Sequence, residues 1–313
     1  MAVKIISKPL FIAVAAGAAT LGVSGYVWNE EHRPPVLEIY VFALPNGRSM
    51  FIRTPDDKRI LIDGGGNADI VRELSKILPF YSRHVDTVIA TETAGKDISG
   101  LIDVILRYSV DRAYIPACTA GSLGLGDPTD ETYSIFLEAL NHLKISTSTV
   151  GAGDTIVLGQ GVSMNALFPV PAKAFAYSKA SSPELLFNIS YGDMSAMFLG
   201  NASVKVQKYI AKISPDKGKV RPTDSDILVV SHSALSANMS PELLNKIEPQ
   251  YLIYSKSDSA SRPKTASSTN PKKKVQTDAL SMIAIQNRFN IRQLGTVRIV
   301  SDGKSMQIKS SPL

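Results

Sequence analysis

Two carboxylates and an ammonium group lie in the loop between a predicted buried strand and the helix that follows it. In α/β enzymes such loops commonly carry the catalytic residues. The segment 88–101 reads VIATETAGKDISGL and supplies Glu92, Lys96 and Asp97. Carboxylates in such a loop can hold a divalent metal ion. A lysine in the same loop can instead pair with the acids and repel such an ion. The sequence therefore poses a choice between a metal site and a salt bridge.

Asp63 in LIDGGG and His232 in SHSAL are the residues that could join Glu92 and Asp97 in an oxygen-rich site for magnesium or manganese. The other interpretation is a salt bridge between Lys96 and one of these acids, in a pocket without catalytic function. We favour the salt bridge. We therefore predict no cofactor, with a weakly bound divalent cation as the alternative, and we assign no catalytic residue.

The chain contains few residues of the types that bind zinc, with four histidines and one cysteine in 313 residues. A catalytic dinuclear zinc or manganese centre needs several imidazoles and carboxylates that converge at about 2 Å. Of the histidines, His32, His84 and His142 lie outside the expected site loops, and only His232 lies in one. The single Cys118 excludes an intramolecular disulfide framework and a cysteine-rich zinc site.

The elements that must position these residues alternate along the chain. Apolar periodicity and turn residues predict strands and helices. The strands are expected at 36–44, 48–54, 59–66, 86–91, 112–117, 154–159, 161–169, 185–192, 194–200, 226–231 and 251–255, and the helices at 68–81, 97–109, 129–144, 203–213, 240–248 and 278–289. Strand groups on both sides of helical groups indicate two sheets packed face to face with helices outside.

The N-terminal region predicts a membrane anchor. Residues 10–28 contain no charged side chain and, as a helix, would be close to the ~30 Å thickness of a bilayer. Lys4 and Lys8 precede this stretch and Glu30 and Glu31 follow it, which places the N-terminus in the cytoplasm and the body outside.

A cleaved secretory signal is the alternative, because the small residues Ala16–Ala18 resemble a cleavage site. We favour the anchor, since the apolar stretch continues beyond that site. The expected organisation is a cytoplasmic N-terminus (1–9), a transmembrane anchor (10–28), a linker (29–35) and a folded domain (36–313).

A basic insertion interrupts the expected domain at 256–276. This stretch is rich in Ser, Thr, Pro and Lys, and it carries six cationic residues against one acid, Asp258, in a chain of net charge +6. Such composition predicts a disordered loop. Lys272, Lys273 and Lys274 are its candidate phosphate-binding residues. The loop is interpreted either as a solvated linker or as an arm for DNA, another polyanion or anionic lipid headgroups.

The order and spacing of several blocks resemble the metallo-β-lactamase-fold domain of ComEC-type competence proteins, over residues 36 to 303. The blocks are LEIYVFALPNGRSMFIRTPDDKRILIDGGG, DTVIATETAGKDISGL, ALFPV, FNISYGDMSAMFLGNAS and DILVVSHSALS. The resemblance implies an α/β fold, the metallo-β-lactamase-like αββα sandwich. In that family the domain follows a multi-span membrane channel for DNA uptake, and here one N-terminal helix is expected in place of that channel.

The metal-binding pattern of the family is replaced here. A pattern of the type T-H-P-D-A-D-H-I-G-G-L falls on residues 91–101, and its ligand positions hold Glu92, Ala94, Lys96 and Asp97. None of the four matches the family. The resemblance therefore implies a degenerate site.

The other blocks of the sequence also lack residues of the family's metal site. Asn201 stands where the family has a bridging aspartate, and His232 is what remains of a pair of histidines. Ala43 and Arg48 stand at two acidic positions of the first loop, whereas Asp63 matches.

These observations predict a membrane-anchored, catalytically inactive binding or assembly module with its C-terminal domain outside the cytoplasm. DNA uptake is the leading analogy, and protein partners in the envelope are expected. The alternatives are a metal-dependent phosphodiesterase or nuclease with a remodelled site, and an envelope scaffold without a nucleic-acid role.

Overall fold

A computed structural model describes the folded part of the chain. The described residues are 35–79, 81–93, 95–117, 131–171, 173–175, 184–213, 225–231, 239–255 and 283–311. Val36–Leu313 forms one compact unit.

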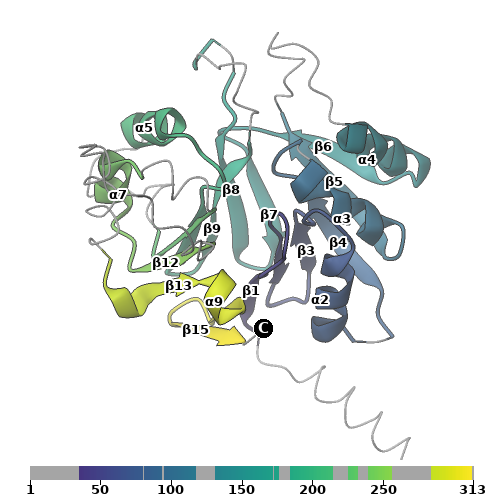
Figure 1. Ribbon diagram of the computed structural model, residues 1–313, viewed down its shortest axis with the longest axis horizontal. Coiled ribbons are helices and arrows are strands. Elements are labelled where there is room, and N and C mark those ends of the chain that lie inside the picture. The colour runs from purple at the N-terminus through teal and green to yellow at the C-terminus, as the bar shows by residue number, and fades with distance from the viewer. Residues whose placement is uncertain are drawn as a thin grey trace, which may run out of the picture. The chain divides into compact units, whose positions relative to one another are not determined.

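Two mixed sheets form the centre of this unit (Figure 1). The first sheet has the order β15 (Met306–Ser311), β14 (Thr296–Ser301), β1 (Leu37–Val41), β2 (Met50–Arg53), β3 (Arg59–Ile62), β4 (His84–Ile89), β5 (Ser109–Pro116) and β6 (Ser146–Val150). The second has the order β13 (Arg288–Asn290), β12 (Tyr251–Tyr254), β11 (Ile227–Val230), β10 (Met194–Phe198), β9 (Leu186–Tyr191), β8 (Val162–Phe168) and β7 (Thr155–Gly159).

Helices cover the outer face of each sheet. Figure 1 shows α2 (Asp69–Ile77), α3 (Gly95–Ile105) and α4 (Glu131–His142) beside the first sheet, and α5 (Val204–Ile213) and α7 (Pro241–Ile247) beside the second. The helix-facing cores are separate hydrophobic clusters, and a third cluster lies between the sheets. The αββα sandwich expected from the sequence is therefore confirmed as an architecture.

β3 shows how the sequence specifies this layering. Ile60 and Ile62 pack into the core between the sheets, whereas Leu61 packs against the helices, and all three are fully buried. A strand covered on both faces needs apolar residues at successive positions, which is the pattern of Ile60–Ile62 between the charged Arg59 and Asp63.

The glycine loop after β3 lies directly against α3. A Cβ on Gly100 would come within 2.0 Å of the carbonyl oxygen of Gly64, so this approach requires a glycine. The amide of Gly64 donates to the carbonyl of Asp97, and the amide of Gly65 to that of Arg48. These glycines therefore join the loop backbones on which Asp97 and Arg48 lie.

The expected helix at 278–289 is wrong where the structure describes it. A 3₁₀ turn, η2 (Ile285–Asn287), leads into β13, and the short helix α9 (Ile291–Leu294) follows. β13 pairs in parallel with β12, so tertiary pairing overrides the local helical pattern. The Asn290 side chain then begins α9 by accepting from the Arg292 amide at 3.2 Å.

The predicted anchor (10–28) and the basic insertion (256–276) lie outside the described residues, and both stay predictions. Among the residues that the structure does describe, no helix is long and apolar enough to cross a bilayer.

Candidate functional site

A guanidinium group lies among three carboxylates at one end of the sandwich. Arg48 belongs to the loop between β1 and β2, Glu92 and Asp97 to the segment from β4 into α3, and Glu184 to the residues just before β9. Loops of both sheets thus bring their charged side chains to one place. We call these four residues the Arg48 cluster.

The contacts within the Arg48 cluster are direct. Nη2 of Arg48 lies 3.0 Å from Oε1 of Glu92 and 3.5 Å from Oδ2 of Asp97. Nη1 of Arg48 donates to Oε1 of Glu184. The backbone amide of Arg48 also donates to Oδ1 of Asp97 at 2.6 Å. One residue therefore binds three acids, and it holds one of them through both backbone and side chain.

The acids of this cluster are shielded from solvent. The side chain of Asp97 is 1% exposed, that of Glu92 7% and that of Glu184 8%, while Arg48 is 22% exposed. Buried carboxylates are strongly destabilising unless a cation or a hydrogen-bond donor compensates them. Arg48 supplies that compensation from within the chain.

A hydrogen bond between the carboxyl groups of Glu92 and Asp97 shifts their pKa values in opposite directions. Burial, the hydrogen bond to Asp97 and nearby Glu184 raise the pKa of Glu92 to about 9, against the lowering effect of Arg48. Burial alone would raise the pKa of Asp97 too. The hydrogen bond from Glu92 and the charges of Arg48 and Lys96 nevertheless hold that pKa below its usual value. At neutral pH Glu92 is thus the protonated donor and Asp97 the ionised acceptor.

Asp63 fixes the strand ends beneath the cluster. Its Oδ1 accepts the Thr91 amide at 2.8 Å and its Oδ2 the Thr91 hydroxyl at 2.6 Å. Burial raises the pKa of Asp63 to about 7, with Asp97 adding to the rise and Arg48 opposing it. Asp63 therefore supports the loop that carries Glu92.

The ammonium group of Lys96 approaches the same acids from the solvent side. Nζ of Lys96 lies 3.9 Å from Oε1 of Glu92 and 3.8 Å from Oδ2 of Asp97, and the side chain is 56% exposed. The expected ion pair is present, but it is long and exposed. The cation that lies among the acids is Arg48, to which the sequence analysis gave no such role.

Asn201 extends the polar network toward the second sheet. Its backbone amide donates to both carboxylate oxygens of Glu184, at 3.0 and 2.8 Å, and its side-chain oxygen accepts from Ser231. Gly200 lies against the same carboxylate, because a Cβ there would fall 1.7 Å from Oε1 of Glu184 and 2.3 Å from Nη1 of Arg48. A glycine at this position makes room for the ion pair.

A small cavity adjoins Arg48, with a volume of about 60 Å³. Its lining combines Glu184 and Ser231 with the aromatic residues Phe42, Phe187 and Phe198. Such a volume holds a few water molecules. It is much smaller than the pocket of several hundred Å³ that a nucleotide-sized ligand needs.

The described residues of this cluster do not fit the metal centre that the fold family implies. Such a centre needs imidazoles and carboxylates with free lone pairs that converge on one point. Here the carboxylate oxygens face the guanidinium of Arg48, and the ammonium of Lys96 lies within 4 Å.

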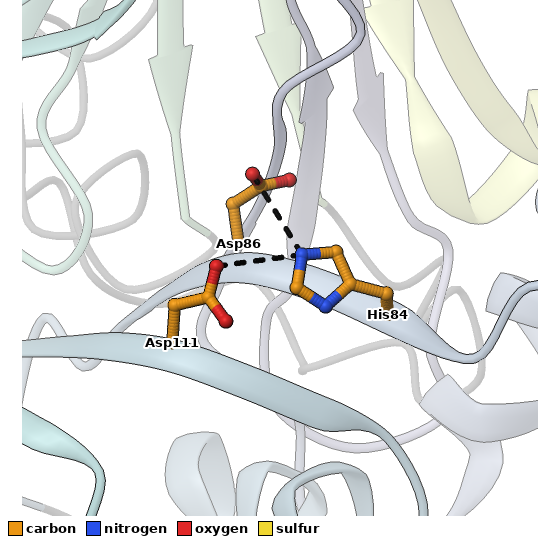
Figure 2. A group of neighbouring side chains, drawn as sticks. All are labelled: His84, Asp86 and Asp111. Atoms are coloured by element: carbon orange, nitrogen blue, oxygen red, sulfur yellow. Dashed lines mark ion pairs between the residues drawn. The ribbon is translucent and has the colours of Figure 1, made fainter.

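A different cluster corrects the prediction that the chain has no cofactor. His84, Asp86 and Asp111 offer ligand atoms that all lie within 4.8 Å of one another, on the neighbouring strands β4 and β5 (Figure 2). A prediction of no cofactor is therefore wrong for the chain as a whole. The resemblance to the family implies metal ligands only in its site loops, and His84 lies outside those loops.

Several predicted positions lie outside the described residues. They are Ala94, His232, Lys272, Lys273 and Lys274. The positions that the structure does bring together are Asp63, Glu92, Lys96, Asp97 and Asn201, with Arg48 and Glu184 between them.

Glu184 is the site residue that sequence reasoning missed. It is the one acidic residue between Asp154 and Asp193, and it directly precedes the apolar run of β9. An isolated acid at the start of a buried strand is a signal that could have been used. Arg48 could have been assigned its role because a cation stands at a position where the family resemblance implies an acid.

No protein-family model and no curated protein sequence matches the chain. Several solved structures have a similar arrangement of the chain. They include CmlA, a diiron β-hydroxylase from Streptomyces venezuelae (15% identity, TM-score 0.44, 70% of this chain and 44% of that one), the metallo-β-lactamase fold protein YhfI from Bacillus subtilis (9%, 0.46, 81% and 96%) and Zn²⁺-bound PqqB from Methylobacterium extorquens (14%, 0.45, 69% and 88%).

The match with CmlA spans less than half of that protein's length. At such identities a likeness concerns the fold and does not extend to activity, ligands or partners.

Proposed function

We propose that this chain is a binding or assembly module on a metallo-β-lactamase-like sandwich, in which Arg48 has replaced catalytic metal at the Arg48 cluster. The observation that carries the proposal is the position of the guanidinium, which contacts Glu92, Asp97 and Glu184 at once. The cluster is then a structural joint between loops of the two sheets and does not hydrolyse a substrate.

The charge balance of the cluster supports this proposal. With Glu92 protonated, the cations Arg48 and Lys96 stand against the anions Asp97 and Glu184. A divalent ion about 4 Å from the guanidinium would be opposed by about 8 kcal/mol at an effective dielectric constant of about 20. Metal binding would therefore require Arg48 to leave the site.

DNA uptake is the process that we propose for the module. The resemblance to ComEC-type domains and the six cations of the segment 256–276 support it. Lysine and arginine side chains can bind phosphates individually, without the fixed geometry needed to read bases. The partner proposed for this arm is DNA, and protein partners of the same envelope machinery would assemble on the sandwich.

A hydrolysis assay tests the loss of catalysis. The full chain is incubated with bis(p-nitrophenyl) phosphate and with a cephalosporin, in the presence of zinc or manganese. We expect turnover no faster than that of Asp97→Asn and Glu184→Gln variants prepared in parallel. Turnover that both substitutions abolish, and that His84→Ala retains, would show a working metal centre at the Arg48 cluster.

We also propose that the chain is a single-pass membrane protein whose C-terminal domain lies outside the cytoplasm. A reporter fused after Leu313 should be active only in the extracytoplasmic compartment. A mature N-terminus near Ala19 would replace the anchor by a cleaved signal peptide, and a reporter active in the cytoplasm would contradict the topology.

A further inference from the structure

His84, Asp86 and Asp111 form a group of potential metal ligands on β4 and β5, with His84 at the start of β4, whereas Glu92 of the Arg48 cluster follows the end of β4. His84 and Asp86 belong to β4, and Asp111 belongs to the parallel neighbour β5. Figure 2 shows the imidazole ring with one nitrogen directed toward both carboxylates. The ligands therefore come from the sheet itself and not from a loop.

The distances in this group fit coordination better than hydrogen bonding. Nε2 of His84 lies 3.7 Å from Oδ1 of Asp86 and 3.5 Å from Oδ2 of Asp111. A hydrogen bond between these atoms would be about 2.7 to 3.0 Å long. Two ligands at about 2.0 to 2.1 Å from a tetrahedral zinc ion are about 3.3 to 3.5 Å apart. The observed separations are close to the edges of such a tetrahedron.

The other ring nitrogen of His84 has a partner that defines the tautomer. Nδ1 lies 2.9 Å from Oγ of Ser109, and the Ser109 hydroxyl donates to the carbonyl of Arg83 at 3.2 Å. With its proton committed to that carbonyl, Ser109 accepts from Nδ1–H. Nε2 then faces two carboxylates, an arrangement that either a proton on Nε2 or a metal ion between the three groups makes favourable. A second hydrogen bond that orients a ligating imidazole in this way is typical of metal sites.

Asp86 is also held in position by its surroundings. Its Oδ2 accepts the backbone amide of Arg59 at 3.0 Å, which leaves Oδ1 directed to the site. The same Oδ1 accepts from Nζ of Lys58 at 2.9 Å, and the Lys58 side chain is 52% exposed. Lys58 therefore competes with a metal for one ligand atom, but it can move into solvent. An open groove that contains Asp86 and Asp111 gives a hydrated ion access.

We propose that His84, Asp86 and Asp111 form a mononuclear divalent-metal site that takes zinc, with solvent in the remaining position. Three protein ligands and one exchangeable position distinguish this site from a closed structural zinc site. The Lys58 ammonium group weakens zinc binding by occupying Oδ1 of Asp86 until the ion arrives. The site is independent of the Arg48 cluster.

Calorimetric titration of the full chain with zinc chloride after treatment with a chelator tests this proposal. We expect one zinc ion to bind at the site in each chain. His84→Ala, and separately Asp111→Asn, should remove that binding event. Both side chains are at least one-third exposed, so neither substitution should prevent folding. Lys58→Met should tighten zinc binding about two- to fivefold, the effect of removing an exposed ion pair.

His142→Ala is the matched control, because His142 lies at the end of α4 and outside the group. It should leave zinc binding at the site unchanged, and so should Glu184→Gln in the Arg48 cluster. Zinc binding that persists in both His84→Ala and Asp111→Asn, or no binding by the unaltered chain, would overturn the proposal. A Lys58→Met chain that binds zinc more weakly would contradict the competing role of Lys58.

Discussion

Nη2 of Arg48 lies 3.0 Å from Oε1 of Glu92, although the two residues are 44 positions apart and belong to different loops. Asp97 and Glu184 complete the surroundings of the same guanidinium. A cation supplied by the chain thus lies where the family resemblance leads one to expect a metal ion. These contacts join loops of both sheets.

Gly200 should be sensitive to the smallest possible side chain. In Gly200→Ala the new Cβ would fall 1.7 Å from Oε1 of Glu184 and 2.3 Å from Nη1 of Arg48, at a φ of +42°. The Arg48–Glu184 pair must then separate. We expect the free energy of unfolding, measured in urea, to fall by about 2 to 3 kcal/mol.

Gly153→Ala is the control for backbone strain alone. Gly153 has a φ of +95°, and a Cβ there would meet nothing within 4 Å. Its substitution should cost about 1 kcal/mol. Equal losses in the two variants would show that the Arg48–Glu184 pair contributes nothing to the effect at Gly200.

The shared proton of Glu92 predicts a pH dependence of stability. The pKa of Glu92 is raised from 4.5 to about 9 on folding, chiefly by burial. Between these two values the unfolded state releases the proton and the folded state keeps it, so the free energy of unfolding falls as pH rises. Below the lower value both states are protonated and this contribution is fully present.

Glu92→Gln should remove that dependence, because the amide keeps a donor toward Asp97 without a titratable proton. Relative to the unaltered chain, the variant should gain up to about 1.4 kcal/mol per pH unit between pH 6 and 8. Urea denaturation at several pH values measures this gain. Asp63 titrates in both proteins and cancels in the comparison. Parallel stability curves would mean that Glu92 is ionised in the folded state.

Much of the fold could be predicted from the sequence, because β3, α5 and α7 have apolar patterns that match their final burial. β6 has the sequence STSTV and four exposed residues, so it lacks the apolar signal of a strand. It forms because β5 offers it a parallel partner. The same holds for β13, where pairing with β12 overrode a local helical pattern.

The acids of the site could be predicted and their partner could not. Glu92, Lys96 and Asp97 share one segment, so local order was enough to group them. Arg48 and Glu184 are 136 residues apart and meet only through the packing of two sheets. His84 was overlooked for a similar reason, since Asp111 reaches it across a strand pair that the sequence does not show directly.

The basic segment 256–276 should bind DNA weakly and without sequence preference. It has six cations and no aromatic residue, so it lacks a platform for base stacking. If all six cations engage DNA, the logarithm of affinity should fall with the logarithm of salt concentration with a slope of at most about −5. Replacing Lys272, Lys273 and Lys274 by glutamine should lower affinity for single and double strands alike and flatten that slope.

The thermal stability of this triple variant should equal that of the unaltered chain, because the three substitutions exchange charged for polar side chains and remove no apolar side chain. Fluorescence anisotropy over a range of salt concentrations measures both affinity and slope. An unchanged slope would remove DNA as the partner of the segment. If the triple variant instead lost affinity for anionic vesicles and kept its affinity for DNA, the segment would bind the membrane surface and not DNA.

Manganese binding measured by electron paramagnetic resonance tests the replacement of metal by Arg48 most directly. All chains carry His84→Ala, so that the separate site on β4 and β5 does not contribute. We expect Arg48→Ala to create a manganese site among Glu92, Asp97 and Glu184, whereas Arg48→Lys, which keeps the cation, should not. A chain with Arg48 intact that binds one manganese ion, and loses it on Glu184→Gln, would show that Arg48 has not replaced a metal ion.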